Sequence, residues 1–266
     1  MSLSPALDRF AADYALQRAA EGRALPPDDL ASLPYLRTGP HARQWSVKAR
    51  TFEALLRRTL EPLAKARKRP LCVLDLGAGN GWLSHRLSRA GHFGTAVDIR
   101  DDGVDGLGAA RRLLEGTAFD CCKASFDCLP IADCEADIVV FNASLHYSTD
   151  LATTLREAVR VTRSGGRIAI LDSPFYECDT HGATMVAEKH SNASTTFGSR
   201  ADTLLALPFV EYLTPARLEE ASKRSGLRWR RHRVRYPLWY ELRPLHAAIA
   251  GRRPPSRFDL WEGMVA

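Results

Sequence analysis

Short apolar runs alternate with amphipathic stretches through the middle of this 266-residue chain. The apolar runs predict strands, and they read LCVLDL at 71–76, FGTAVDI at 93–99, FDCCKAS at 119–125, ADIVVFNAS at 136–144 and RIAILDS at 167–173. Helical periodicity between them predicts helices over about 81–89, 108–116 and 151–166, the last with a glycine stop. Repeated strand–helix units predict an α/β fold with a parallel, doubly wound sheet, whose ligand site lies at the carboxyl ends of the strands.

The segments before this core have helical patterns. Residues 4–22 and 42–65 each predict a helix, and a proline-rich linker joins them. Pro62 is expected to kink or end the second helix. We predict that residues 1–68 form an N-terminal helical extension that caps the main domain at 69–266.

The segments after the core are less regular. Thr214 and Gly226 bracket a predicted helix as its N-cap and its glycine end. Further strands are expected within 227–236 and 257–265, which brings the sheet to seven strands. The regular pattern lapses over 173–212, and this irregular insertion is predicted to cover the site as a lid.

Composition narrows the class of protein. With 45% hydrophobic residues, the chain can bury a sizeable core. It shows neither an N-terminal apolar segment nor a run of about 18 apolar residues, so we expect a soluble, cytoplasmic protein. The six cysteines form no Cys-x-x-Cys pair, which favours reduced thiols. His181, Glu188 and His190 fit no known ligand spacing, so no metal site is expected.

Positive charge is concentrated near the C-terminus. The net charge is +6, but residues 223–257 hold eleven Lys or Arg against Glu241 alone, which gives this segment +10. Such a segment is typical of contact with nucleic acid or with an anionic membrane surface.

A glycine-rich turn follows the first predicted strand. Gly77, Gly79 and Gly81 alternate with other residues, whereas the dinucleotide fingerprint would place its third glycine at the position of Trp82. No Gly-Lys-Ser/Thr follows, so the turn is not a phosphate-binding P-loop. Asp75, two residues before the first glycine, would repel a pyrophosphate but suits a ligand with a cationic end.

A second acid indicates which ligand this is. Asp98 ends the second predicted strand, where a carboxylate can accept hydrogen bonds from both hydroxyls of a ribose. Together with Asp75, it suits an adenosine with a free ribose and a zwitterionic amino-acid tail, which describes S-adenosylmethionine.

Four segments between residues 71 and 172 resemble motifs of the class I S-adenosylmethionine-dependent methyltransferases: VLDLGAGNG, AVDI, ADIVVFNASLHY and REAVRVTRSGGRIAILD. FNASLHYSTD is also similar to the quinone-type small-molecule branch. The resemblance implies a Rossmann-like fold, close backbone approach at the three glycines, an amino-group contact by Asp75 and a ribose contact by Asp98. The cofactor-binding residues it implies in these motifs are Asp75, Gly77, Ala78, Gly79, Asn80, Gly81, Asp98, Ile99, Asn142 and Ala143.

The adenine contact departs from the family pattern. Many relatives have an Asp followed by a small residue four positions before a Leu-Pro, and here Ser125 and Phe126 occupy those positions before Leu129. Ser125 can still hydrogen-bond the adenine edge, and Asp127 can substitute if it turns inward. We expect weaker adenine discrimination or a different contact.

The acceptor is expected near the end of the fourth strand, where His146 and Tyr147 follow Ala143. The catalytic candidates are His146, as a base or an acceptor-orienting group, and Tyr147, which is better suited to be a wall. The alternative for His146 is packing against the cofactor or capping the next helix. Asp172, at the end of the fifth strand, is a weaker candidate.

The sequence favours methylation of a small molecule on a hydroxyl oxygen, ahead of carbon or nitrogen. One rival is RNA methylation, because aromatic residues are interleaved with the basic segment: Trp229, Tyr236, Trp239 and Tyr240. Against it, the fourth strand ends in NASL, not in the Asn/Asp-Pro-Pro-Tyr/Phe motif of enzymes that methylate base amino groups. A second rival is a lipid or quinone methyltransferase at a membrane surface. The oligomeric state is not indicated.

Overall fold

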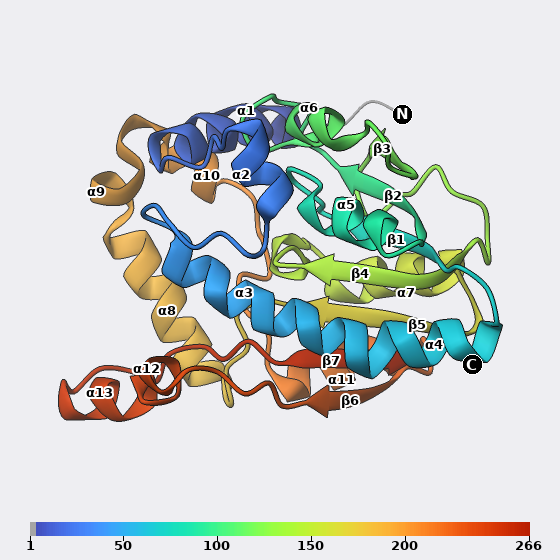
Figure 1. The fold of residues 1–266 in the computed structure, drawn as a ribbon. Coiled ribbons are helices and arrows are strands. Elements are labelled where there is room, and N and C mark those ends of the chain that lie inside the picture. The colour runs from blue at the N-terminus through green and yellow to red at the C-terminus, as the bar shows by residue number, and fades with distance from the viewer. Residues whose placement is uncertain (1–3) are drawn as a thin grey trace.

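The computed structural model describes residues 4–266 and contains a seven-stranded sheet in the order β3-β2-β1-β4-β5-β7-β6 (Figure 1). The strands are β1 Cys72–Leu76, β2 Phe93–Asp98, β3 Phe119–Lys123, β4 Ala136–Asn142, β5 Thr162–Leu171, β6 Arg228–His232 and β7 Leu260–Met264. All neighbouring strands are parallel except β7, which is antiparallel to both β5 and β6. The mostly parallel α/β sheet predicted from the sequence is confirmed.

The order of the strands creates a site between β1 and β4. The chain proceeds outward from β1 to β2 and β3, and then returns to β4 and continues on the other side to β5. A crevice opens at the carboxyl ends of the strands where the order reverses in this way. The glycine turn after β1 and the segment after β4 therefore face each other.

Helices cover both faces of the sheet. One face packs against α3 Ala42–Leu55, α5 Trp82–Arg89 and α6 Leu107–Ala110, and the other against α7 Leu151–Val161 and α11 Pro215–Ser222. Ile138 and Val140 of β4 are buried in the first core. Val139 and Phe141 are buried in the second. A parallel strand covered on both faces has no solvent side, which accounts for the continuous apolar run of β4.

The predicted helix over 151–166 is too long. It ends at Val161, and Thr162 already pairs with Ala136 at the start of β4. The register shifts just after this pair, and Gly165 has φ 71°, which is outside the right-handed helical region. The glycines interpreted as a helix stop therefore lie in the irregular first part of β5.

The helix through Pro62 does not end there. α3 continues into a π-helical turn at Leu56–Leu60 and then into α4 Glu61–Arg67. Pro62 lies in the first turn of α4, where the absence of its N–H is tolerated. The irregularity expected at this proline takes the form of the π-helical turn before it.

The segment 173–212, expected to be irregular, is largely helical. It contains α8 Asp179–Ser191, α9 Ala193–Phe197 and α10 Ala201–Leu205. Gly182 is the single buried residue of α8, so this helix has no apolar stripe for sequence reasoning to detect. Figure 1 shows these helices along one side of the molecule, and α10 contacts α1 Pro5–Ala20.

Three further helices are short. They are α2 Pro27–Ser32 in the proline-rich linker, and α12 Leu238–Glu241 and α13 Arg243–Ile249 between β6 and β7. Figure 1 shows α12 and α13 projecting from one end of the molecule. Across residues 4–266, the helices are all too short or too polar to cross a membrane.

Candidate active site

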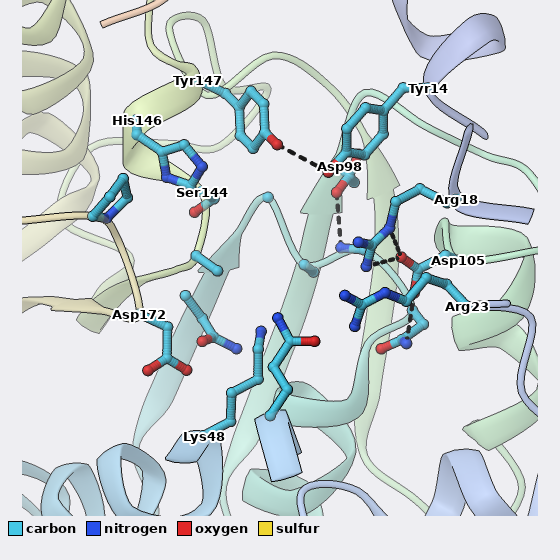
Figure 2. Close-up of a pocket in the computed structure, with 18 of the residues that line it drawn as sticks. Tyr14, Arg18, Arg23, Lys48, Asp98, Asp105, Ser144, His146, Tyr147 and Asp172 are labelled. Atoms are coloured by element: carbon cyan, nitrogen blue, oxygen red, sulfur yellow. Dashed lines mark hydrogen bonds and ion pairs between the residues drawn. The ribbon is translucent and has the colours of Figure 1, made fainter. Parts of the chain in front are cut away.

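A cavity of about 780 Å³ lies at the carboxyl ends of the central strands, with residues of α1 and α3 among its walls (Figure 2). Ten of the twelve residues expected at the cofactor line it: Gly77, Ala78, Gly79, Asn80, Asp98, Ile99, Ser125, Phe126, Asn142 and Ala143. His146 and Tyr147 line the same cavity. The fold therefore gathers segments from four strand ends around one space.

Gly77 and Gly79 form the part of the turn that faces the cavity. Both have positive φ angles, 74° and 54°. A Cβ at Gly77 would lie 2.3 Å from Cβ of Ser144, so the turn packs against the end of β4 only because this side chain is absent. The Gly79 N–H donates to Asp98 Oδ2 at 2.7 Å. A bare backbone thus lies beside a buried carboxylate, an arrangement that fits the sugar and tail of S-adenosylmethionine.

Asp75 and Gly81 lie outside the cavity lining. Asp75 is 1% exposed and accepts a hydrogen bond from Ser84 Oγ on Oδ2 at 3.0 Å. Its Oδ1 has no hydrogen-bond partner among residues 4–266, and burial raises the pKa of this carboxyl to about 7. Gly81 precedes α5 with φ 71°, and a Cβ there would meet the Ala110 side chain at 2.6 Å. Gly81 therefore serves the packing of the turn.

The loop after β3 holds both residues considered for the adenine contact. Ser125, Phe126 and Asp127 all line the cavity. Ser125 Oγ accepts from the Asp127 N–H at 3.3 Å, and Thr154 donates to Asp127 Oδ1. Burial raises the pKa of the Asp127 carboxyl. The aspartate is thus turned inward, with one of its oxygens held by Thr154.

His146 and Tyr147 lie in a short 3₁₀ helix after β4. The Tyr147 hydroxyl is 2.9 Å from the hydroxyl of Tyr14 on α1, and burial raises its pKa well above the usual value. His146 Nδ1 is buried without a hydrogen-bond partner among residues 4–266. Burial, with help from nearby lysines, lowers the pKa of His146 to about 3. His146 is therefore a neutral imidazole and Tyr147 a protonated phenol at neutral pH.

The wall of the cavity after β4 and β5 contains two residues with strained backbone, one of which is an acid. Ala143 and Asp172 directly follow β4 and β5 with φ angles of 56° and 50°, which non-glycine residues rarely adopt. Asp172 accepts a hydrogen bond from Thr51 Oγ1 at 2.7 Å. Burial raises the pKa of Asp172, and the Lys48 ammonium opposes this effect. Figure 2 shows Lys48 rising from α3 into the cavity, with Asp172 on one side and Arg23 on the other.

Sequence reasoning missed the cavity residues that the N-terminal helices supply. Arg18 of α1 pairs with Asp105 at 2.6 Å, and Arg23 lies beside them with its Nε buried, 3.7 Å from a Glu21 carboxylate oxygen and without a hydrogen-bond partner among residues 4–266. Phe10, Tyr14 and Arg18 all line the cavity. Their spacing of four residues is the one local signal that could have grouped them. Residues 4–266 contain no cluster of three or more metal-ligating side chains.

A family model described as a methyltransferase domain matches residues 74–170. Malonyl-(acyl-carrier protein) O-methyltransferase from Erwinia pyrifoliae is 34% identical over 99 residues, 37% of this chain and 36% of that protein. Malonyl-(acyl-carrier protein) O-methyltransferase 1 from Coxiella burnetii is 29% identical over 151 residues, 54% and 48% of the two chains. Demethylmenaquinone methyltransferase from Mycolicibacterium paratuberculosis is 36% identical over 100 residues, which are 38% of this chain and 40% of that protein. The chain thus matches less than half the length of each of these relatives.

Solved structures share the fold over most of the chain. The methyltransferase in complex with the Haloferax volcanii Trm112 methyltransferase activator has a TM-score of 0.58 at 19% identity, with 90% of this chain and 96% of that chain covered. Magnesium protoporphyrin IX methyltransferase from Synechocystis, solved with bound S-adenosylhomocysteine, has a TM-score of 0.56 at 15% identity, with 97% and 100% covered. At these identities the likeness concerns the fold.

Proposed function

We propose that the chain is a class I S-adenosylmethionine-dependent methyltransferase and that it transfers a methyl group to an oxygen of a small-molecule acceptor. The observation that carries this proposal is the single cavity shared by the glycine turn, Asp98, His146 and Lys48. Ligand pockets usually enclose about 300–1,000 Å³. A cavity of about 780 Å³ therefore offers room for the cofactor and a compact acceptor together.

We assign the cofactor to the side of the cavity formed by β1 and β2. The backbone at Gly77 and Gly79 would face the methionine part of the cofactor, and Asp98 would accept from the ribose hydroxyls. Asp75 lies behind the turn with its Oδ1 unsatisfied, and a cationic amino end on this side would favour the ionised form of this carboxyl, whose pKa burial raises to about 7. Such placement supplies most of what methyl transfer requires, because the sulfonium is already an activated donor.

The acceptor oxygen that suits this cavity best belongs to a carboxylate. His146, with its pKa lowered to about 3, is a weak base, and Tyr147 holds its own proton firmly. The hydroxyl favoured by the sequence needs a base, whereas a carboxylate is already ionised. Its oxygen would attack the methyl carbon as the carbon–sulfur bond breaks, giving a methyl ester and S-adenosylhomocysteine without proton transfer.

Charge in the cavity supports the same acceptor. Lys48 and Arg23 line the cavity. Arg23 Nε lies 3.7 Å from a Glu21 carboxylate oxygen, whereas Lys48 forms no ion pair among residues 4–266. Burial lowers the pKa of Lys48, and an anionic acceptor would favour its charged form. The O-methyltransferase names of two matched relatives agree with an oxygen acceptor.

The test incubates the protein with methyl-labelled S-adenosylmethionine and a small-molecule extract of host cells. We expect label in the solvent-extractable fraction that mild alkali releases as methanol, because esters hydrolyse and ethers do not. Alkali-stable label would overturn the carboxylate and leave a hydroxyl, carbon or nitrogen acceptor. If a whole lysate is used instead and the label is sensitive to RNase, the small-molecule proposal is wrong. The Gly79→Ala variant provides the control for enzyme-dependent transfer.

A further inference from the structure

Four aliphatic side chains are exposed on α12, on α13 and at Leu242 between them. Leu238, Leu242, Leu245 and Ile249 are 78%, 42%, 55% and 77% exposed. Their spacing of four, three and four residues places them along one side of a helical segment, and we call them the aliphatic stripe. Other exposed large apolar side chains between residues 4 and 266 occur singly on separate elements, as scattered exposure normally does.

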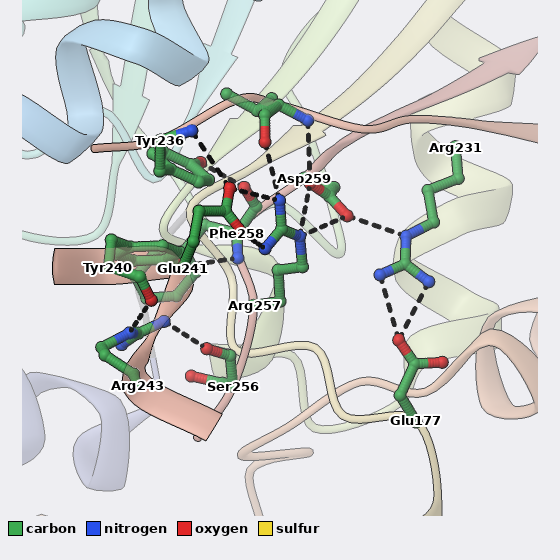
Figure 3. Close-up of polar contacts among 11 residues, drawn as sticks. Glu177, Arg231, Tyr236, Tyr240, Glu241, Arg243, Ser256, Arg257, Phe258 and Asp259 are labelled. Carbon is green, nitrogen blue, oxygen red and sulfur yellow. Dashed lines mark hydrogen bonds and ion pairs between the residues drawn. The ribbon is translucent and has the colours of Figure 1, made fainter. Parts of the chain in front are cut away.

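Hydrogen bonds and an ion pair attach α12 to the residues just before β7 (Figure 3). Arg257 donates to both carboxylate oxygens of Glu241, at 2.7 and 3.1 Å. The Phe258 N–H donates to the Tyr240 hydroxyl at 3.0 Å, and the Arg243 guanidinium stacks 3.6 Å from the centre of the Tyr240 ring. These contacts fix the helical segment, so the stripe is exposed on an ordered part of the structure.

Basic residues occur on another side of α13 and in the segment that follows it. A second cavity of about 360 Å³ beside α13 is lined by Glu188, Arg243, His246, Ala247, Arg252, Arg253 and Pro255. Its single acid, Glu188, is paired with Arg253 at 2.8 Å. Arg235 is exposed nearby in the chain, before α12. A surface that combines projecting aliphatic side chains with a basic cavity is complementary to phospholipid headgroups above an acyl layer.

We propose that α12 and α13 dock the protein on an anionic phospholipid surface. The stripe would enter the boundary between headgroups and acyl chains, and the arginines beside α13 would bind the phosphates. A protein partner fits less well, because the stripe is aliphatic and projecting, whereas protein interfaces concentrate energy in aromatic and arginine residues seated in pockets. Trp239, Tyr240 and Arg243 also line the main cavity, so docking brings its wall to the membrane surface.

The experiment measures co-sedimentation with vesicles of phosphatidylcholine alone and of phosphatidylcholine mixed with phosphatidylglycerol. We expect wild-type protein to bind only the mixed vesicles. A triple variant, Leu242→Ser with Leu245→Ser and Ile249→Ser, should lose at least about tenfold in partitioning. Leu16→Ser, which alters an exposed leucine on α1, is the matched control and should bind as wild type.

Charge-reversal variants and the oligomeric state provide the remaining tests of the proposal. Arg235→Glu with Arg252→Glu should also abolish binding, whereas Arg89→Glu, on the exposed side of α5, should not. Equal binding by the triple variant and wild type would overturn the proposal. Absence of binding to mixed vesicles would also overturn it. If the wild-type protein then forms a dimer and the triple variant is monomeric, the stripe is an interface with a second copy of this chain. Vesicle binding is independent of methyl transfer, so its failure is distinguishable from failure of the proposed function.

Discussion

The hydroxyl oxygens of Tyr14 and Tyr147 lie 2.9 Å apart, although 133 residues separate them in the chain. Tyr14 belongs to α1 and Tyr147 to the segment after β4, so one hydrogen bond joins the N-terminal helix to the end of a central strand. The Tyr147 ring also lies beside His146, with ring centroids 4.3 Å apart. α1 therefore helps to position the side chains on the side of the cavity that we assign to the acceptor.

Replacing Tyr14 with Phe should lower the rate of methyl transfer by about fivefold, because one neutral hydrogen bond contributes about 1 kcal/mol. The ring that packs against Tyr147 would remain, so the thermal midpoint should change little. Initial rates with labelled cofactor and the cell extract provide the measurement. Tyr35→Phe, which alters a tyrosine outside the cavity, is the control. Equal rates for the two variants would show that the link to α1 has no role in turnover.

Gly79→Ala should lower affinity for S-adenosylmethionine by about tenfold or more, because its Cβ would lie 3.2 Å from the Asp105 carbonyl oxygen and displace the turn assigned to the cofactor. The matched control is Gly116→Ala. Gly79 and Gly116 both have positive φ, 54° and 66°, but Gly116 lies outside the cavity with no atom near its added Cβ. Each variant should lose about 1–2 kcal/mol of stability from the left-handed backbone. Calorimetric titration should then detect weaker binding in Gly79→Ala alone.

Asp75→Asn should stabilise the protein at alkaline pH while weakening cofactor binding. Burial raises the pKa of Asp75 from 3.8 to about 7, so the folded state holds its proton more tightly than the unfolded state. The free energy of unfolding therefore falls as pH rises from about 4 to 7, by at most about 4 kcal/mol for this group. Urea unfolding at pH 5 and pH 8 should show a larger gain for Asp75→Asn at pH 8. Asp120→Asn, on the exposed side of β3, should show no such difference.

The parts of this site that the sequence predicted are those with local signals. The glycine turn and the apolar run of β4 each lie within one short segment whose neighbours determine its conformation. Lys48 and Arg23 gave no comparable signal, because they reach the cavity from α3 and from the loop after α1, and only the packing of these N-terminal segments brings them there. α8 was missed for the opposite reason: it is a helix whose side chains are nearly all accessible, so its sequence has no buried stripe.

His146 should act by hydrogen bonding and not as a base with a pKa near neutrality. With its pKa lowered to about 3, it stays neutral across the physiological range, so the rate should show no step from His146 between about pH 6 and 8. His146→Gln should retain more activity than His146→Leu, which should lose about tenfold. His190→Gln, an exposed position outside the cavity, is the control. A step near pH 6.5 that disappears in His146→Gln would instead identify His146 as the base.

Lys48→Met is the sharpest test of an anionic acceptor. Lys48 lines the cavity beside Asp172, and its ammonium keeps the pKa of that carboxyl from rising further. Loss of this charge should increase by about tenfold or more the amount of extract needed for half-maximal transfer, because a carboxylate would lose its cationic partner. Lys48→Arg should recover part of the effect.

Affinity for S-adenosylmethionine distinguishes the roles that Lys48 can have. If Lys48 serves the acceptor, calorimetric titration of the cofactor should give nearly the same affinity for Lys48→Met and wild type. Lys65→Met, at an exposed position of α4, controls for the loss of one positive charge elsewhere. An unchanged requirement for extract in Lys48→Met would contradict the carboxylate acceptor. If Lys48→Met weakens cofactor binding alone, Lys48 instead pairs with the carboxylate of the cofactor.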